Sequence, residues 1–274
     1  MYVIGKMKRT ISLTGLFAAY MFLQFTVLGL GNHAGEGWLS TGLRELVYYA
    51  LQVFVILGFL AYAAADRLIR GERNRARAAV FVLAAFFAGA AVMLFAGKGS
   101  LFYLIVTLAV MPCLGCTAGA VYHRMSRETA AGENTARSMG IGSAVAVALQ
   151  FVLQIQWGVT PVLAVFMLAA LLLVGYVLLR SPPRSEGGTA EPTPPRRVLF
   201  ACLIAAAFVL FTSFYNGYLH HLQIQSGYTD YNLYSWPRLM MIPCYLLFAA
   251  IGDKRQGALV PVAALFLEIV RIGT

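Results

Sequence analysis

Nine long apolar runs, separated by short polar segments, constrain this chain more than any other feature of its sequence. A helix that crosses a membrane needs about 20 mostly apolar residues, and all the runs except the last have that material. Because lipid offers backbone groups no hydrogen-bond partners, such spans must be helical. The predicted fold class is therefore an all-α, polytopic transmembrane helical bundle. The runs cover residues 10–30, 43–65, 78–96, 101–122, 138–156, 161–179, 198–219, 233–251 and 258–270.

The composition agrees with this reading. Apolar residues make up 60% of the 274 residues, and charged residues make up only 12%, about half the charged share of an ordinary soluble domain. These proportions exclude a water-soluble single domain, a disordered chain and a disulfide-stapled secreted domain. The lipid bilayer is therefore the expected partner. The net charge of +10 does not predict a nucleic-acid partner, because basic residues gather on the cytoplasmic loops of membrane proteins.

The positions of the basic residues predict the orientation. Most of the 21 lysines and arginines lie before the first run or just after the second, fourth, sixth and eighth runs. Segments on the cytoplasmic side of a membrane carry this excess of positive charge. We therefore expect a multi-pass protein of the cell membrane, in a bacterium the inner membrane, with a cytoplasmic N-terminus.

A segment rich in proline and glycine, residues 181–196, divides the chain. Such a composition is typical of an extended linker, and the topology places this one in the cytoplasm. It separates a six-helix bundle at residues 1–180 from a second part at residues 197–274, for which about three helices are expected.

The two parts begin alike, with Lys8 and Arg9 before the first run and Arg196 and Arg197 before the seventh. An acidic and a basic residue also close the second run and the eighth run at nearly the same offset. Matching spacing of this kind predicts an internal repeat.

A six-helix unit, a long linker and a second unit that begins alike resemble the major facilitator superfamily of transporters. That family also carries an Asp-Arg pair and a basic cluster between its second and third helices, although it usually has a glycine where this chain has Tyr62. The resemblance implies that a small organic solute crosses by alternating access between two bundles. It also implies a conformational gate at the inner face, with candidates Asp66, Arg67, Arg70, Arg73, Asp253, Lys254 and Arg255.

Members of that family have twelve helices, and this chain supplies about nine. The last run, residues 258–270, is only about 20 Å long as a helix, against a hydrocarbon core of about 30 Å. We therefore expect an incomplete second bundle. Either the chain is truncated, or partner helices or a homo-oligomer complete it.

Polar residues within the runs are candidates for the solute site. Gln150 and Gln154 are four residues apart and share one helix face; they either bind the solute or link helices. Arg238 either binds an anionic group or extends to the interface beside Trp236, and the second reading is favoured. The first, fourth and seventh helices line the cavity of the resembled family, which implies Tyr20, Gln24, Tyr103, Thr107, Tyr215 and Asn216.

No metal site, cofactor or enzyme chemistry is predicted. Cys113 and Cys116 lie within one apolar run beside two glycines, which favours close helix packing over metal binding. His220 and His221 lack a third ligand, and no catalytic motif is present. The leading hypothesis is a transporter of a small, neutral or weakly anionic organic solute. The alternatives are a membrane sensor module of a signalling or transcription-regulating protein, and an incomplete bundle that serves as a structural subunit.

Overall fold

Every element that the structure describes is an α-helix, and no strand occurs in this part of the chain. The computed structural model describes residues 2–32, 34–35, 37–69, 72–96, 99–130, 135–157, 161–180, 239 and 241–251. The predicted all-α fold class is confirmed. The predicted linker and the seventh and ninth runs lie outside the described residues. The helices are α1 (Tyr2–Asn32), α2 (Thr41–Leu68), α3 (Glu72–Phe95), α4 (Leu101–Ala130), α5 (Thr135–Trp157), α6 (Pro161–Arg180) and α9 (Met241–Ile251).

Within these ranges, six helices, α1 to α6, are long and apolar enough to cross a membrane. They coincide with the first six predicted runs. Helix α9 is a shorter apolar helix and corresponds to the end of the eighth run. These helices indicate a multi-pass membrane protein.

Several helices continue past their apolar runs. Helix α1 begins at Tyr2 and α4 ends at Ala130, each about two turns beyond the apolar boundary. Arginine, lysine and glutamate favour helical backbone, so the charged residues do not end these helices. The basic segments at this end are therefore helical extensions rather than loops. Arg124, which the sequence placed in a polar connection, lies on α4.

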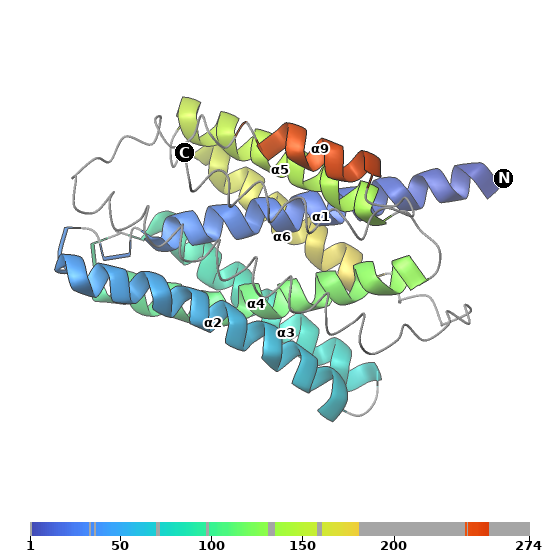
Figure 1. The fold of residues 1–274 in the computed structure, drawn as a ribbon. Helices are drawn as coiled ribbons and strands as arrows, with labels where there is room; N and C mark the ends of the chain where they lie inside the picture. The colour runs from blue at the N-terminus through green and yellow to red at the C-terminus, as the bar shows by residue number, and fades with distance from the viewer. Residues whose placement is uncertain are drawn as a thin grey trace, which may run out of the picture.

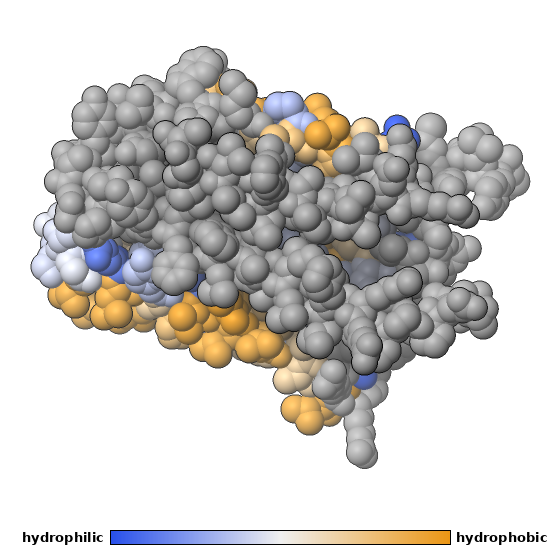
Figure 2. All heavy atoms as spheres, in the orientation of Figure 1, coloured by the Kyte–Doolittle hydropathy of each residue, from blue (hydrophilic) through white to orange (hydrophobic). Residues whose placement is uncertain are grey.

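Helix α1 lies at the centre of the bundle. In its membrane window 61% of residues are buried, against 11% for α2 and 17% for α3. Successive helices run antiparallel, so the start of α1, the end of α2 and the end of α4 lie toward the same end (Figure 1). Helix α5 packs extensively on α1, as α2 does on α4. The other contacting pairs are α3 with α4, α6 with α1, α1 with α4 and α3 with α6. The outer surface over α2 is apolar (Figure 2), as expected of a helix that contacts lipid.

This packing pattern repeats after three helices. Exchanging α1 with α4, α2 with α5 and α3 with α6 converts the α1–α5 contact into α2–α4 and the α1–α6 contact into α3–α4, and it leaves α1–α4 and α3–α6 unchanged. The smaller α5–α6 contact has no counterpart of its extent between α2 and α3. Helices α1 and α4 run in opposite directions (Figure 1). The first six helices are therefore arranged as two three-helix units of inverted topology, a regularity that the sequence alone did not indicate.

Glycines let α2 and α4 approach backbone to backbone. A Cβ atom on Gly58 would collide with the carbonyl of Pro112, and one on Gly115 would collide with the carbonyl of Val55. The Sγ of Cys116 donates a hydrogen bond to the Gly58 carbonyl at 3.1 Å. Helices in lipid have no hydrophobic driving force for association, and small residues at their contact allow the close van der Waals packing that holds them together. The prediction that this segment serves close helix packing is confirmed.

Helix α9 packs along α5, although the linker separates them in sequence (Figure 1). A Cβ atom on Gly140 of α5 would lie 2.7 Å from the Cβ of Ala249 and 2.8 Å from its backbone nitrogen. The α5–α9 contact is therefore also a close approach at a glycine. It joins the C-terminal part of the chain to the six-helix bundle.

Candidate binding site at the junction of α1, α2 and α4

Three aromatic side chains from two other helices lie around Tyr122 of α4. The ring of Tyr122 lies 5.9 Å from Phe17 and 5.9 Å from Tyr20, both on α1, and 6.4 Å from Phe59 on α2, measured between centroids. All three pairs are edge-to-face, the geometry that the ring quadrupole favours. We call Phe17, Tyr20, Phe59 and Tyr122 the aromatic cluster. Of these residues, the sequence predicted only Tyr20.

The aromatic cluster has a buried side and an open side. Phe17 and Tyr20 are each 2% exposed, whereas Tyr122 is 37% exposed and Phe59 41% exposed. The accessible side is therefore formed by Tyr122 of α4 and Phe59 of α2.

Two amide side chains, Gln24 of α1 and Gln150 of α5, lie about one helical turn beyond the level of Tyr20. A Cβ atom on Gly142 of α5 would lie 3.0 Å from the Ala18 nitrogen and the Thr14 oxygen of α1. Because these helices run in the same direction, advancing eight residues along both brings Gln150 level with Gln24. Gln150 is 2% exposed, and the Oε1 of Gln24 is buried without a hydrogen-bond partner in the described part of the chain. Gln24 and Gln150 therefore lie at the same level of the bundle, about one helical turn beyond Tyr20.

Tyr103 and Thr107 have a different environment. Both are fully buried, and their hydroxyls donate to backbone carbonyls: Tyr103 to Leu30 at 3.1 Å, and Thr107 to Tyr103 at 2.8 Å. Leu30 lies ten residues beyond Tyr20 on α1, or about 15 Å along the helix. Tyr103 therefore fastens α4 to the far end of α1, away from the aromatic cluster, whereas the Thr107 bond stays within α4.

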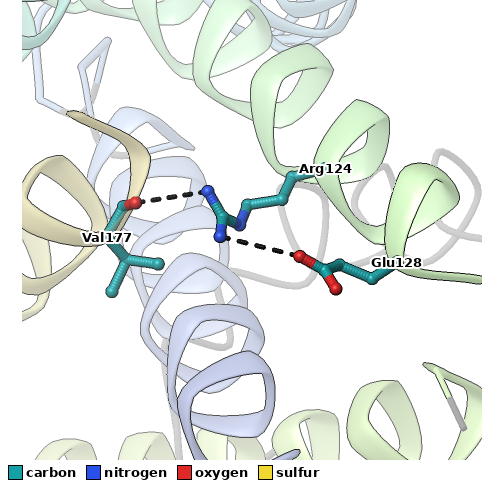
Figure 3. Close-up of polar contacts among 3 residues, drawn as sticks. All are labelled: Arg124, Glu128 and Val177. Atoms are coloured by element: carbon teal, nitrogen blue, oxygen red, sulfur yellow. Dashed lines mark hydrogen bonds and ion pairs between the residues drawn. The ribbon is translucent and has the colours of Figure 1, made fainter. Parts of the chain in front are cut away.

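A buried ion pair lies at the other end of α4. The Nη2 of Arg124 is 3.7 Å from the Oε1 of Glu128, and the two side chains are 12% and 3% exposed. The Nη1 of Arg124 donates to the Val177 carbonyl at 3.5 Å. Figure 3 shows the guanidinium between the carboxylate on α4 and the α6 backbone. The Val177 carbonyl is among the last four of α6, which have no partner within their helix.

Arg124 therefore holds the end of α6 against α4, about 3 Å farther along α4 than Tyr122. This pair was not predicted from the sequence, because both residues lie past the apolar run. The four-residue spacing of Arg124 and Glu128 was the signal that could have identified it.

A second polar contact joins α2 and α4 at the same end. The Tyr62 hydroxyl and the His123 Nδ1 are 2.9 Å apart and share a hydrogen bond. The Tyr62 ring also lies against Gly119, where a Cβ atom would be 2.7 Å from it. Tyr62 is the residue at the position where the resembled family usually has glycine. Its ring occupies the space left by Gly119 across the seam.

Among the gate candidates, Arg73 is exposed at the start of α3. Its neighbour Arg75 donates from Nε to the Ile69 carbonyl at 2.9 Å, which ties the start of α3 to the end of α2. Asp66 and Arg67 belong to α2 and Gln154 to α5, but their side chains are outside the described set. The candidates that lie wholly outside the described residues are Arg70, Tyr215, Asn216, Arg238, Asp253, Lys254 and Arg255.

The assembled site offers aromatic faces, phenol hydroxyls and amides, and the aromatic cluster itself contains no charged residue. No group of three or more metal-ligating side chains occurs among the residues described. The arrangement is suited to binding an organic molecule by stacking and hydrogen bonding. The chain matches no protein-family model, no curated protein and no solved structure.

Proposed function

We propose that this chain is a transporter of the major facilitator type, which moves a small, neutral or weakly anionic organic solute across the membrane by alternating access. The inverted three-helix units support this proposal, because such repeats are nested within each six-helix half of that superfamily. The contact of α9 with α5 supports it as well, because a second unit must pack against the first for the two to rock about a shared site.

The observation that carries the proposal is the exposure of Tyr122. A tyrosine with three aromatic neighbours in a membrane bundle is normally enclosed, yet 37% of this residue is accessible. A solute at this position would contact the ring faces and exchange hydrogen bonds with phenols and amides.

The charge distribution suits the proposed solute class. Burying an unpaired charge in a membrane interior is costly, and the aromatic cluster offers no carboxylate to pair with a cationic solute. The nearest cation along α4 is Arg124, two residues beyond Tyr122. It provides a favourable field for a weakly anionic group, while Glu128 limits that field by pairing with the same guanidinium.

Alternating access also requires contacts that break at one end of the bundle. The bond from Arg124 to the Val177 carbonyl is long, at 3.5 Å. We propose that it opens when the inner end of α4 moves relative to α6. The proposed gate formed by Asp66, Arg67, Arg70, Arg73, Asp253, Lys254 and Arg255 would act at the same membrane face.

Uptake by purified protein in liposomes tests this function. Vesicles are incubated with a defined mixture of sugars, amino acids, nucleosides and monocarboxylates, and their contents are identified by mass spectrometry. We expect at least one solute to accumulate above its level in empty vesicles, and Tyr122→Ala to abolish that uptake. Tyr103→Phe is the control, because the Tyr103 hydroxyl bonds to the backbone away from the aromatic cluster. We expect this variant to take up the solute at a rate near that of the wild type.

No uptake of any solute would refute transport by this chain. Saturable binding without uptake would favour the sensor module instead. A stable oligomer that neither binds nor transports would favour the structural subunit.

A further inference from the structure

Helix α3 carries two arginines on its outward face. Its fully buried residues Phe86, Ala90 and Met93 face α4 and α6, the two helices against which α3 packs. At about 100° per residue, Arg73 and Arg77 lie within about 50° of the direction opposite these residues. Both arginines are exposed.

An exposed apolar stripe continues from the arginines along the same face. Val80 is 49% exposed, Phe81 is 74% exposed, and Phe95, near the other end of α3, is 75% exposed. In a helix that spans a membrane, such a stripe contacts acyl chains. Arg73 and Arg77 thus lie at the level where the acyl chains end and the lipid headgroups begin.

Arg75 is an internal reference for this argument. It is exposed as well, but it lies about 200° around the helix from Arg73. Its Nε donates to the Ile69 carbonyl at 2.9 Å. Of three arginines within five residues, one therefore fastens the α2–α3 turn, while the other two project outward above the apolar stripe.

Arginine is well matched to a phosphate group. Its planar guanidinium donates two parallel hydrogen bonds to phosphate oxygens, and residues four apart on a helix are neighbours on one face. The segment 67–77 contains five arginines and one glutamate, so its field attracts anions. The continuous apolar stripe below the arginines favours a lipid phosphate over a soluble one.

We propose that Arg73 and Arg77 form a binding site for the headgroup of an anionic phospholipid, whose acyl chains lie along Val80 and Phe81. The proposal depends only on α3 spanning the membrane, and it stands whether or not the chain transports a solute. It also gives Arg73 a role at the lipid boundary, distinct from the gate implied by the family resemblance.

Native mass spectrometry of the full chain in detergent tests this site, with phosphatidylglycerol and phosphatidylcholine titrated separately. We expect tighter binding of phosphatidylglycerol, and a loss of about fivefold in its affinity for each of Arg73→Gln and Arg77→Gln, the value of one basic residue at an anionic membrane surface. Arg75→Gln removes the same charge from the same segment and is expected to change the affinity less than twofold.

Three results would overturn the proposal. One is equal binding of the two lipids. Another is equal weakening by all three substitutions, which indicates a diffuse charge effect. The third is displacement of phosphatidylglycerol by 10 mM inorganic phosphate, which would assign the arginines to a soluble anion. Elution of each variant at the wild-type volume in size-exclusion chromatography controls for folding.

Discussion

The glycines of α1 and α4 allow a matched test of the helix packing. Replacing glycine with alanine in a helix interior gains about 1 kcal/mol in helix propensity. At Gly15 of α1 the new Cβ would have no other atom within 4 Å. We therefore expect Gly15→Ala to raise the free energy of unfolding by up to about 1 kcal/mol.

The same substitution at Gly115 has the opposite outcome. The new Cβ would collide with the Val55 carbonyl and lie 2.8 Å from the Phe59 nitrogen. Both atoms belong to the α2 backbone and cannot move independently, so the helices must separate. Overpacking costs about 1–3 kcal/mol, and a rigid backbone neighbour places Gly115→Ala near the upper limit. After the gain of about 1 kcal/mol in propensity, we expect a net loss of about 2 kcal/mol.

Unfolding by sodium dodecyl sulfate in mixed micelles, followed by circular dichroism, measures both variants under one set of conditions. The predicted order of stability is Gly15→Ala, then wild type, then Gly115→Ala. If Gly115→Ala were as stable as Gly15→Ala, the backbone contact between α2 and α4 would be refuted.

Three further predictions concern bonds and orientation. Tyr103→Phe is expected to lower the free energy of unfolding by about 1 kcal/mol, the contribution of one hydrogen bond. An unchanged free energy of unfolding would contradict the bond from Tyr103 to the Leu30 carbonyl. Glu128→Leu leaves the Arg124 charge buried and is expected to lower the free energy of unfolding by about 3 kcal/mol, whereas the double variant with Arg124→Met regains most of that loss. Equal stability of the single and double variants in the same unfolding assay would argue against the ion pair. Ser40→Cys is expected to react with an impermeant maleimide in intact cells, and Ser126→Cys only after permeabilisation; the reverse result inverts the proposed orientation.

The sequence predicted the first six helices because membrane insertion depends on local composition. Runs of apolar residues long enough to cross the bilayer are visible without any tertiary information. The helix ends were less predictable. A run such as 101–122 stops where hydropathy falls, whereas backbone hydrogen bonding continues through Arg124 and Glu128 to Ala130.

The candidate site was only partly predictable for a different reason. The aromatic cluster comes from three helices, and periodicity within one helix does not specify which faces meet. Tyr20 and Gln24 were predicted from the family resemblance, but Phe17, Phe59 and Tyr122 could not be distinguished from other apolar or interfacial residues. Tyr103 was predicted by the same resemblance. It bonds to a backbone carbonyl, a use that depends on the distance between α1 and α4.

The central claim, alternating access at the aromatic cluster, is tested most directly at position 122. Tyr122→Cys is introduced after the four native cysteines are replaced by alanine, and an impermeant thiosulfonate is added to either face of sealed membrane vesicles. The account predicts reaction from both faces, while Ser40→Cys and Ser126→Cys each react from one face only. Reaction of Tyr122→Cys from a single face, or from neither, would contradict it.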